Sequence, residues 1–366
     1  TMWEALVLRQ RTSVGLDVHA RSVIGCGFDC ETGAVVERRL CPDPGEIGAW
    51  VATLAAPVKV VYEAGPTGYG LARHLLATGI DCVVAAPSKL IRPQGDRVKT
   101  DARDARHLAR LLYLGEVVAV QIPSLEQEAA RDLVRARDDC REDLMAARHR
   151  LTHILLRRGI VYSGGHPWTG NHDVWLHQQR FDHPAQQRTF DEALDAVLAA
   201  TARRDRLDAA ITAMAAHSEF SPVITRLGCL RGISTLTAFG MAVEIGDWHR
   251  LTGRSIGNYL GLVPTECSSG PSRHQGGITR TGNKHVRRLL IEAAWQHRKP
   301  YRPGVGLRRR WAAACPAARA RGQEGNFRLH QRWINFDQRK KRPVIANAAV
   351  ARELAGWCWS LAVIED

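Results

Sequence analysis

The sequence predicts an N-terminal α/β domain, followed by a long helical arm and a mainly helical C-terminal domain. Short β-rich segments joined by turn residues fill the first 40 residues, strand and helix patterns then alternate as far as residue 114, and helical periodicity dominates from residue 124 onward. A chain of 366 residues is also too long for one small core. We therefore expect two or three domains, each with an interior of its own.

The N-terminal segment is predicted to form three short strands. VGLDVHA (14–20) and SVIGCGFD (22–29) are rich in strand-forming residues and partly alternate in polarity. CETG then supplies turn residues before AVVERRL (34–40), and the Pro- and Gly-containing stretch CPDPGEIG that follows is expected to be a loop. Three strands joined by tight turns indicate a meander.

After this meander, strand and helix patterns alternate. A helix is expected over residues 49–54, and the continuous apolar run VKVVYEA (58–64) is typical of a buried central strand. A helix in LARHLLATG (71–79), a strand in DCVVAAP (81–87) and a helix over 100–114 follow. A meander followed by alternating strands and helices is the order of a ribonuclease-H-like fold.

From residue 124 to residue 158 the chain contains no Gly or Pro, which predicts one long helix. A second helix is expected over 189–217, after an irregular stretch rich in Trp and His. Apolar residues of the first helix recur in a 4,3 rhythm that Arg137 alone interrupts, as expected of a coiled-coil seam: Leu133, Cys140, Leu144, Ala147, Leu151 and Ile154. Two readings remain open, an antiparallel arm that joins subunits and a helical hairpin packed on its own domain.

The C-terminal part begins with two short apolar helices around the turn RGIS, within residues 227–248, a pattern similar to a helix-hairpin-helix. A polar, Gly-rich loop dense in Ser, Arg and His then leads into a basic helix. We expect domain boundaries that give residues 1–120, 121–220 and 221–366 to the α/β domain, the arm and the C-terminal domain.

The charge balance points to a polyanionic partner. The chain has 51 Lys and Arg against 37 Asp and Glu, a formal net charge of +14. Such a surface favours nucleic acid over an anionic membrane, although a basic surface without a ligand is the alternative. No apolar run approaches the roughly 20 residues that a membrane-spanning helix needs, and no signal peptide is recognised, so we expect a cytoplasmic protein.

Four acidic residues stand at positions where this fold brings its elements together. Asp17 lies within the first strand, Glu63 ends the apolar strand, and Asp101 and Asp104 share one side of the helix that follows. Each acid alone has a structural reading: a salt-bridged strand residue, a solvated strand end, or helix capping after Thr100. Together they predict a site for divalent metal, because converging carboxylates repel one another unless cations intervene.

The motifs GLDVH, YEAGPTGYGL and VKTDARDARHLARL, followed by CLRGIS, GLVPTECSSG and GGITRTGNKHVRRLL, resemble those of the DEDD insertion-sequence transposases, which include the bridge-RNA-guided recombinases. The resemblance extends over residues 14–357. It implies a RuvC-like N-terminal domain, a coiled-coil arm and a C-terminal transposase domain with a nucleophilic serine. It also implies a catalytic, Mg²⁺-binding tetrad of Asp17, Glu63, Asp101 and Asp104.

The family's serine precedes the glycine of an S-G step, which here selects Ser269, with Ser268 as the alternative. Basic residues of the same loop and helix are candidate phosphate ligands: Arg273, Arg280, Lys284, Arg287 and Arg288. A phosphoserine–DNA intermediate would conserve the energy of the phosphodiester bond for rejoining.

The resemblance thus implies a DNA transposase that uses Mg²⁺ and a structured guide RNA, acts on the ends of its own element and on target DNA, and assembles as a homodimer or tetramer. The residues alone leave two alternatives open. One is a RuvC-like, metal-dependent DNA junction endonuclease that activates water, and the other is a non-catalytic, basic nucleic-acid-binding protein. An actin-like kinase is disfavoured because the sequence lacks the matching Gly-rich phosphate loops.

Overall fold

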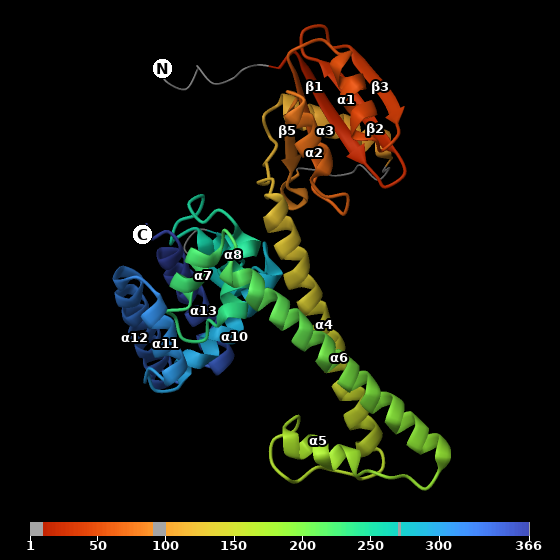
Figure 1. Ribbon diagram of the computed structural model, residues 1–366. Coiled ribbons are helices and arrows are strands. Elements are labelled where there is room, and N and C mark those ends of the chain that lie inside the picture. The colour runs from red at the N-terminus through yellow and green to blue at the C-terminus, as the bar shows by residue number, and fades with distance from the viewer. Residues whose placement is uncertain (1–9, 91–99, 270–271, 366) are drawn as a thin grey trace. The chain divides into compact units, whose positions relative to one another are not determined.

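The computed structural model describes residues 10–90, 100–269 and 272–365, and the side chains of Ser268, Ser269 and Arg273 lie outside the described part. The chain divides into two compact units, residues 1–124 and 125–366. Each is described by itself (Figure 1). Among the described helices, none has the length and apolar character needed to cross a membrane.

The first unit is built on a mixed five-stranded sheet in the order β3-β2-β1-β4-β5. β1 pairs antiparallel with β2 and β2 with β3, whereas β1–β4 and β4–β5 are parallel pairs. The strands are β1 (Thr12–Val18), β2 (Val23–Asp29), β3 (Val35–Leu40), β4 (Val58–Glu63) and β5 (Asp81–Ala85). The mixed α/β domain, with a meander followed by parallel strands, is confirmed.

Helices cover both faces of this sheet. Val14 and Leu16 of β1 are fully buried in a core shared with α1 (Pro44–Ala52) and α2 (Gly70–Ala77). On the opposite face Val61 of β4 packs against Leu108 of α3 (Asp101–Tyr113). A short 3₁₀ turn, η1 (Pro87–Lys89), follows β5. The period-2 alternation of strand side chains therefore assigns every second residue of β1 to the face that α3 covers.

Helix α1 corrects one prediction. CPDPGEIG was expected to be a loop before a helix over 49–54, but the helix begins at Pro44. The Asp43 carboxylate accepts a hydrogen bond from the Glu46 backbone N–H at 2.8 Å, and Pro44 occupies the first helical turn, where its missing N–H costs nothing. The loop-like residues are thus an N-cap and a helix start.

The second unit begins with a helical hairpin formed by α4 (Leu125–Leu156) and α6 (Pro184–Ala216), which lie side by side (Figure 1). The apolar rhythm of α4 is buried from Cys140 to Ile154. Arg137, which interrupts that rhythm, pairs with Asp208 of α6, Nε to Oδ1 at 2.6 Å. The irregular stretch between the two helices contains one helix that was not predicted, α5 (Gly170–His177).

The rest of the second unit is mainly helical, as predicted, and shares one core with the base of the hairpin, where Ala130 and Ile211 are buried. One prediction of a loop is wrong, because the polar Gly-rich segment forms a two-stranded antiparallel hairpin. The elements are α7 (Ser221–Leu227), α8 (Thr235–Ile245), α9 (Ile256–Tyr259), β6 (Pro264–Ser269), β7 (Ser272–Ile278), α10 (Lys284–Ala294), η2 (Trp295–Arg298), α11 (Val305–Ala313), α12 (Pro316–Gln338) and α13 (Pro343–Ala362).

Candidate active site

Two of the predicted acids stand at the same end of neighbouring parallel strands. The pairing of β1 with β4 runs to Leu16 opposite Tyr62, so Asp17 and Glu63 are the next residue on each strand. Because successive strand residues point to opposite faces, Asp17 lies on the face of Gly15, and Glu63 lies on the face of Val61. Both are half-buried on the side of the sheet that α3 covers.

Helix α3 approaches β1 closely because residue 15 has no side chain. A Cβ built on Gly15 would lie 2.1 Å from the carbonyl oxygen of Ala105 and 2.5 Å from the backbone N of Ala109. No side chain fits in that space, so glycine allows backbone-to-backbone contact. The contact brings the first turn of α3 over the end of β1 that carries Asp17.

The other two predicted acids occupy this first turn. Thr100 caps α3, its hydroxyl accepting a hydrogen bond from the backbone N–H of Arg103 at 3.4 Å. Asp101 is exposed and Asp104 is half-buried. Acidic residues in the first turn are also stabilised by the helix dipole, so the capping and metal-site interpretations are compatible.

A histidine joins the acids, and its role was not predicted from the sequence. His19 Nε2 lies 3.1 Å from Asp17 Oδ2 and 3.8 Å from Asp101 Oδ1. One ligand atom from each of these three residues falls within 4.8 Å of the others, the one such cluster of possible metal ligands in the described ranges. The motif GLDVH held the signal, because a residue two positions after Asp17 returns to the same face of an extended segment.

Burial and neighbouring charges govern the ionisation of Asp17. Burial raises the pKa of the Asp17 carboxyl, and the negative charges of Asp101 and Asp104 raise it further, while the charge of His19 and its hydrogen bond lower it in part. A cation among these groups would remove the repulsion.

The donor set fits a divalent metal. Carboxylate oxygens are the ligands that Mg²⁺ and Mn²⁺ prefer. Asp17, Asp101 and His19 offer their atoms at one point, and Asp104 and Glu63 stand beside them through helix spacing and strand register. The N-terminal unit therefore contains a candidate metal centre around Asp17 and Asp101, with His19 hydrogen-bonded to Asp17 and with Asp104 and Glu63 as neighbouring predicted acids.

The predicted serine lies in the second unit, at the end of the two-stranded hairpin. Ser269 is the last residue of β6, and its backbone is opposite Ser272 of β7. The base of the hairpin is fixed by backbone hydrogen bonds, from Thr279 N–H to the Val263 carbonyl at 2.9 Å and from Arg280 N–H to the Gly261 carbonyl at 3.1 Å. The side chains of Ser269, of its alternative Ser268 and of the predicted phosphate ligand Arg273 lie outside the described residues.

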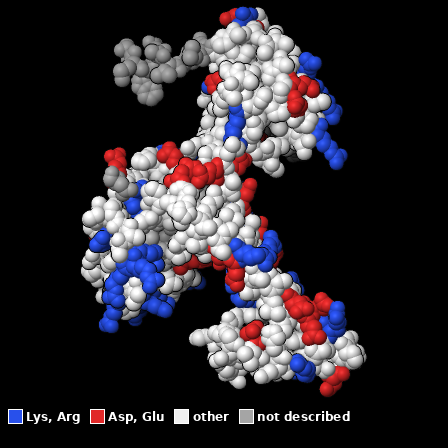
Figure 2. Space-filling model, viewed as in Figure 1, with Lys and Arg blue, Asp and Glu red and all other residues white. Residues whose placement is uncertain are grey.

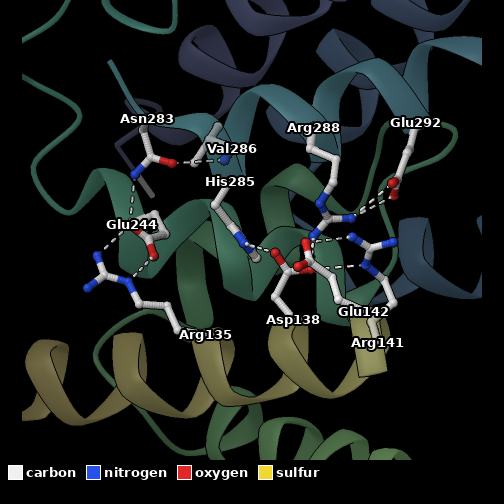
Figure 3. A network of polar contacts seen from close by, with 10 residues as sticks. All are labelled: Arg135, Asp138, Arg141, Glu142, Glu244, Asn283, His285, Val286, Arg288 and Glu292. Atoms are coloured by element: carbon white, nitrogen blue, oxygen red, sulfur yellow. Dashed lines mark hydrogen bonds and ion pairs between the residues drawn. The ribbon is translucent and has the colours of Figure 1, made fainter. Parts of the chain in front are cut away.

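Helix α10 carries three of the predicted phosphate ligands, and two of them have protein partners. Arg287 donates from Nη1 to the carbonyl oxygens of Leu260 at 2.9 Å and Thr281 at 2.7 Å. Arg288 pairs with Asp138 of α4 and, at 2.9 Å, with Glu292 (Figure 3). Arg287 thus fixes the segments on either side of the β6–β7 hairpin, and Arg288 fixes α10 against α4.

Two further predicted ligands lie near the start of α10. Arg280 precedes the helix with a φ of 57°, an uncommon value for a residue with a side chain, and is exposed. Lys284 is the first helical residue and lines an open cavity of about 710 Å³ between α4, α8 and α10. Asn283 caps the helix by accepting from the Val286 N–H at 2.9 Å, and its amide donates to Glu244 Oε2 at 2.7 Å (Figure 3).

Comparison with known proteins assigns both units. Residues 14–158 match the family model of DEDD transposases of the IS110 type, described as "Transposase", and residues 225–303 match the model described as "Transposase IS116/IS110/IS902 family". The "Putative transposase y4qE" of Sinorhizobium fredii is 40% identical over 306 residues, 83% of this chain and 75% of that protein. The "Transposase for insertion sequence element IS1533" of Leptospira borgpetersenii is 29% identical over 92% of this chain and 99% of its own length.

The first family match contains Asp17, Glu63, Asp101 and Asp104, and the second contains the hairpin with Ser269. The matches follow the same order along the chain as the two units of the structure. The chain belongs to the DEDD insertion-sequence transposases, enzymes that cut and rejoin DNA.

Proposed function

We propose that this transposase excises and inserts its own element by Mg²⁺-assisted serine chemistry. The observation that carries the proposal is the meeting of Asp17, Asp101 and His19 at the strand end next to Glu63, with Asp104 one helical turn after Asp101. In this reading all four acids bind metal and act in catalysis. A bound divalent cation would neutralise charge on the scissile phosphate.

The four acids and His19 have distinct tasks in this proposal. Asp17 and Glu63 are fixed by the sheet, whereas Asp101 and Asp104 are fixed by the capped first turn of α3. His19 is a positioning residue, because its hydrogen bond to Asp17 holds that carboxylate in one orientation. Ligands that are already held in place need little rearrangement when the metal binds, and this increases the affinity of the site for the metal.

In the proposed reaction the Ser269 hydroxyl oxygen attacks the phosphorus of a phosphodiester. A P–O bond to serine forms, the P–O bond to one sugar breaks, and the departing sugar oxygen takes up a proton equivalent to the one that serine loses. Attack by a DNA hydroxyl on the phosphoserine reverses these changes with a different strand, so no external energy source is needed. Ser268 is the alternative nucleophile.

Cationic side chains would bind the DNA phosphates around this serine. Arg273, Arg280 and Lys284 are proposed as direct ligands, and Arg287 and Arg288 contribute either directly or by holding α10. At the turn between α7 and α8, Arg231 N–H already donates to Asn326 Oδ1 at 2.8 Å. Phosphate binding in the manner of a helix-hairpin-helix would therefore use the other N–H groups of that turn.

Three finer parts of the proposal concern organisation and partners. Residues 1–120 would act as a RuvC-like catalytic domain, 121–220 as a coiled-coil arm that joins subunits into a dimer or tetramer, and 221–366 as the transposase domain. A structured guide RNA would pair with element ends and target DNA. The two long helices, α4 and α6, are compatible with an arm that joins subunits, and the basic composition is compatible with binding of RNA and DNA.

The experiment is a cleavage assay on labelled element-end DNA, with and without added RNA, in Mg²⁺ and in a chelator. We expect cleavage that needs the metal and is lost in Asp17→Asn. Asp81→Asn is the control and should still cleave, because Asp81 begins β5, at the end of the sheet away from Asp17. Binding without cleavage under every condition would contradict the proposal and favour a non-catalytic basic protein. Cleavage that is specific for branched junctions would favour the RuvC-like endonuclease.

A further inference from the structure

A second basic site lies in the C-terminal unit, in a cavity of about 550 Å³ that is separate from the serine hairpin. Its wall comes from the loop before α9, from α9, and from α12 and α13. Four arginines and one glutamate carry the charge of the lining: Arg254, Arg321, Arg332, Arg352 and Glu353. Three of the four arginines belong to α12 and α13, which lie beyond the residues that either family model matches.

The arginines fall into two groups. Arg321 and Arg332 are held by the protein: Arg321 donates from Nε to Ser360 Oγ at 3.0 Å, and Arg332 Nη1 lies 2.8 Å from Glu353 Oε2. Arg254 and Arg352 are exposed and have no acidic partner among the described residues. The lining thus presents two free guanidinium groups beside two fixed ones.

One buried donor in this cavity also lacks a partner. The Nε atom of Arg332 is buried and makes no hydrogen bond to any described group. A buried polar atom without a partner costs free energy unless a ligand or water satisfies it. Glu353 Oε2, which lies 2.8 Å from Arg332 Nη1, is also buried without a hydrogen bond, so both unsatisfied atoms belong to this ion pair.

Packing contacts position one free arginine, Arg352, and one held arginine, Arg321, at the cavity. A Cβ built on Gly257 of α9 would lie 3.1 Å from Cγ of Arg352, so the absence of a side chain there lets the stem of Arg352 lie against α9. Trp357 serves a similar purpose for Arg321, whose guanidinium carbon lies 4.3 Å from the centre of the indole ring. We assign Trp357 to holding Arg321 rather than to stacking a base.

The chemistry of the cavity selects a phosphate-rich, extended ligand. Guanidinium groups bind phosphate through paired hydrogen bonds. Arg321 and Arg332 are ion-paired with Glu324 and Glu353, and the two remaining arginines of the lining, Arg254 and Arg352, favour a polyanion. Pockets for small metabolites are instead mostly apolar, with few polar groups. Figure 2 shows Lys and Arg gathered over α11 and α12 of the same unit, where Arg308, Arg309, Arg319 and Arg328 are exposed.

We propose that this cavity, defined by Arg254, Arg321, Arg332 and Arg352, is a backbone-phosphate site for a nucleic-acid strand, distinct from the serine hairpin. This proposal depends on the proposed function in one respect, namely that the protein acts on nucleic acid. The contacts are to phosphate, so the site adds affinity and register without reading sequence. DNA and RNA share this chemistry, and the test separates them.

The test compares two double variants of the full-length chain that lose the same charge. Arg254→Ala/Arg352→Ala removes the free arginines. The α4 variant, Arg150→Ala/Arg157→Ala, removes one exposed arginine of α4 and one exposed arginine just after its last residue. Binding of labelled single-stranded DNA, single-stranded RNA and duplex DNA is followed by fluorescence anisotropy over a salt series. Melting curves establish that both variants are folded.

We expect the cavity variant to bind its preferred strand about 10-fold more weakly. Its plot of log affinity against log salt should be shallower by about 1.5, because each neutralised phosphate contributes about 0.7–0.9 to the slope. The strand type with the larger loss identifies DNA or RNA as the ligand. Equal, small effects of the two variants on all strands would overturn the proposal, as would a wild-type chain that binds none of them.

These outcomes are independent of the serine chemistry. A wild-type chain that binds strands through the cavity but never cleaves DNA would contradict the proposed function and leave the phosphate site intact. A chain that cleaves DNA, and whose cavity variant binds like the α4 variant, would overturn the phosphate site alone.

Discussion

Arg135 donates two hydrogen bonds to the carboxylate of Glu244, from Nε to Oε1 at 2.9 Å and from Nη2 to Oε2 at 3.2 Å. The Glu244 side chain is 2% exposed, and Asn283 supplies a third donor at 2.7 Å (Figure 3). Arg135 belongs to α4, Glu244 to α8, and Asn283 caps α10. One buried carboxylate therefore ties the base of the helical hairpin to the helix that follows the serine strands.

Replacing Arg135 by Met should destabilise the C-terminal unit by about 2–3 kcal/mol, because it leaves a buried carboxylate with one of its two main partners missing. Urea denaturation followed by circular dichroism measures the change. Arg188→Met is the matched control, because Arg188 pairs with the exposed Glu192 and should contribute less than about 0.5 kcal/mol. Equal losses in the two variants would contradict the importance of the buried pair.

The same pair predicts a pH dependence. Burial raises the pKa of Glu244, but the hydrogen bonds and charge of Arg135 and the hydrogen bond from Asn283 outweigh burial, so the pKa in the folded chain lies below the ordinary 4.5. The stabilisation is thus fully present above pH 4.5 and is lost as pH falls through the lower, folded-state pKa. The stability difference between wild type and Glu244→Gln should be constant at neutral pH and shrink below about pH 4.5. A difference that stays constant at acid pH would show that Glu244 does not titrate as described.

The fold was predictable where local patterns and burial agree. The apolar run that ends at Glu63 and the β-rich run around Asp17 became adjacent parallel strands, because continuous apolar segments must be covered on both faces. The start of α1 was missed, since Asp43 and Pro44 are turn residues by composition and cap residues only when a helix follows. The β6–β7 hairpin was missed because polar, Gly-rich strands carry no alternating apolar signal.

Gly15 should not tolerate a side chain. Gly15→Ala would place a Cβ 2.1 Å from the Ala105 carbonyl oxygen, so α3 must shift, at a cost of about 2–3 kcal/mol. Because Asp101 and Asp104 move with α3, affinity for a divalent metal should fall as well. Gly48→Ala, in α1, is the control: its nearest neighbour would be 3.8 Å away, and alanine favours a helix by up to about 1 kcal/mol. A Gly15→Ala chain with unchanged melting temperature would contradict the close contact.

His19 should strengthen metal binding through its hydrogen bond to Asp17. Titration of Mn²⁺ into the full chain, followed by electron paramagnetic resonance, should show loss of the site in Asp17→Asn and about 10-fold weaker binding in His19→Ala. Asp81→Asn is the control and should bind Mn²⁺ like wild type, because Asp81, the first residue of β5, pairs with Lys59 of β4 and is not part of the cluster. An unchanged Mn²⁺ affinity in His19→Ala would contradict the positioning role of His19 in metal binding.

The candidate site was predictable in its acids and only in part beyond them. Asp17 and Glu63 were identified because a carboxylate at the end of a buried strand needs an explanation that strand packing does not give. His19 was overlooked because a single histidine is more often solvated than part of a site. The ion pair of Arg288 with Asp138 could not be predicted, since the two residues are 150 positions apart and meet only through tertiary packing.

The central claim is that Ser269 forms a covalent bond to DNA with the help of metal at the four acids. The most direct measurement is a denaturing gel of wild type, Ser268→Ala and Ser269→Ala, each incubated with labelled element-end DNA, RNA and Mg²⁺. We predict a slow, protease-sensitive DNA band in wild type and Ser268→Ala that is absent from Ser269→Ala. Cleavage of DNA by Ser269→Ala, with no protein-linked band in any lane, would contradict the account and identify a nuclease that uses water.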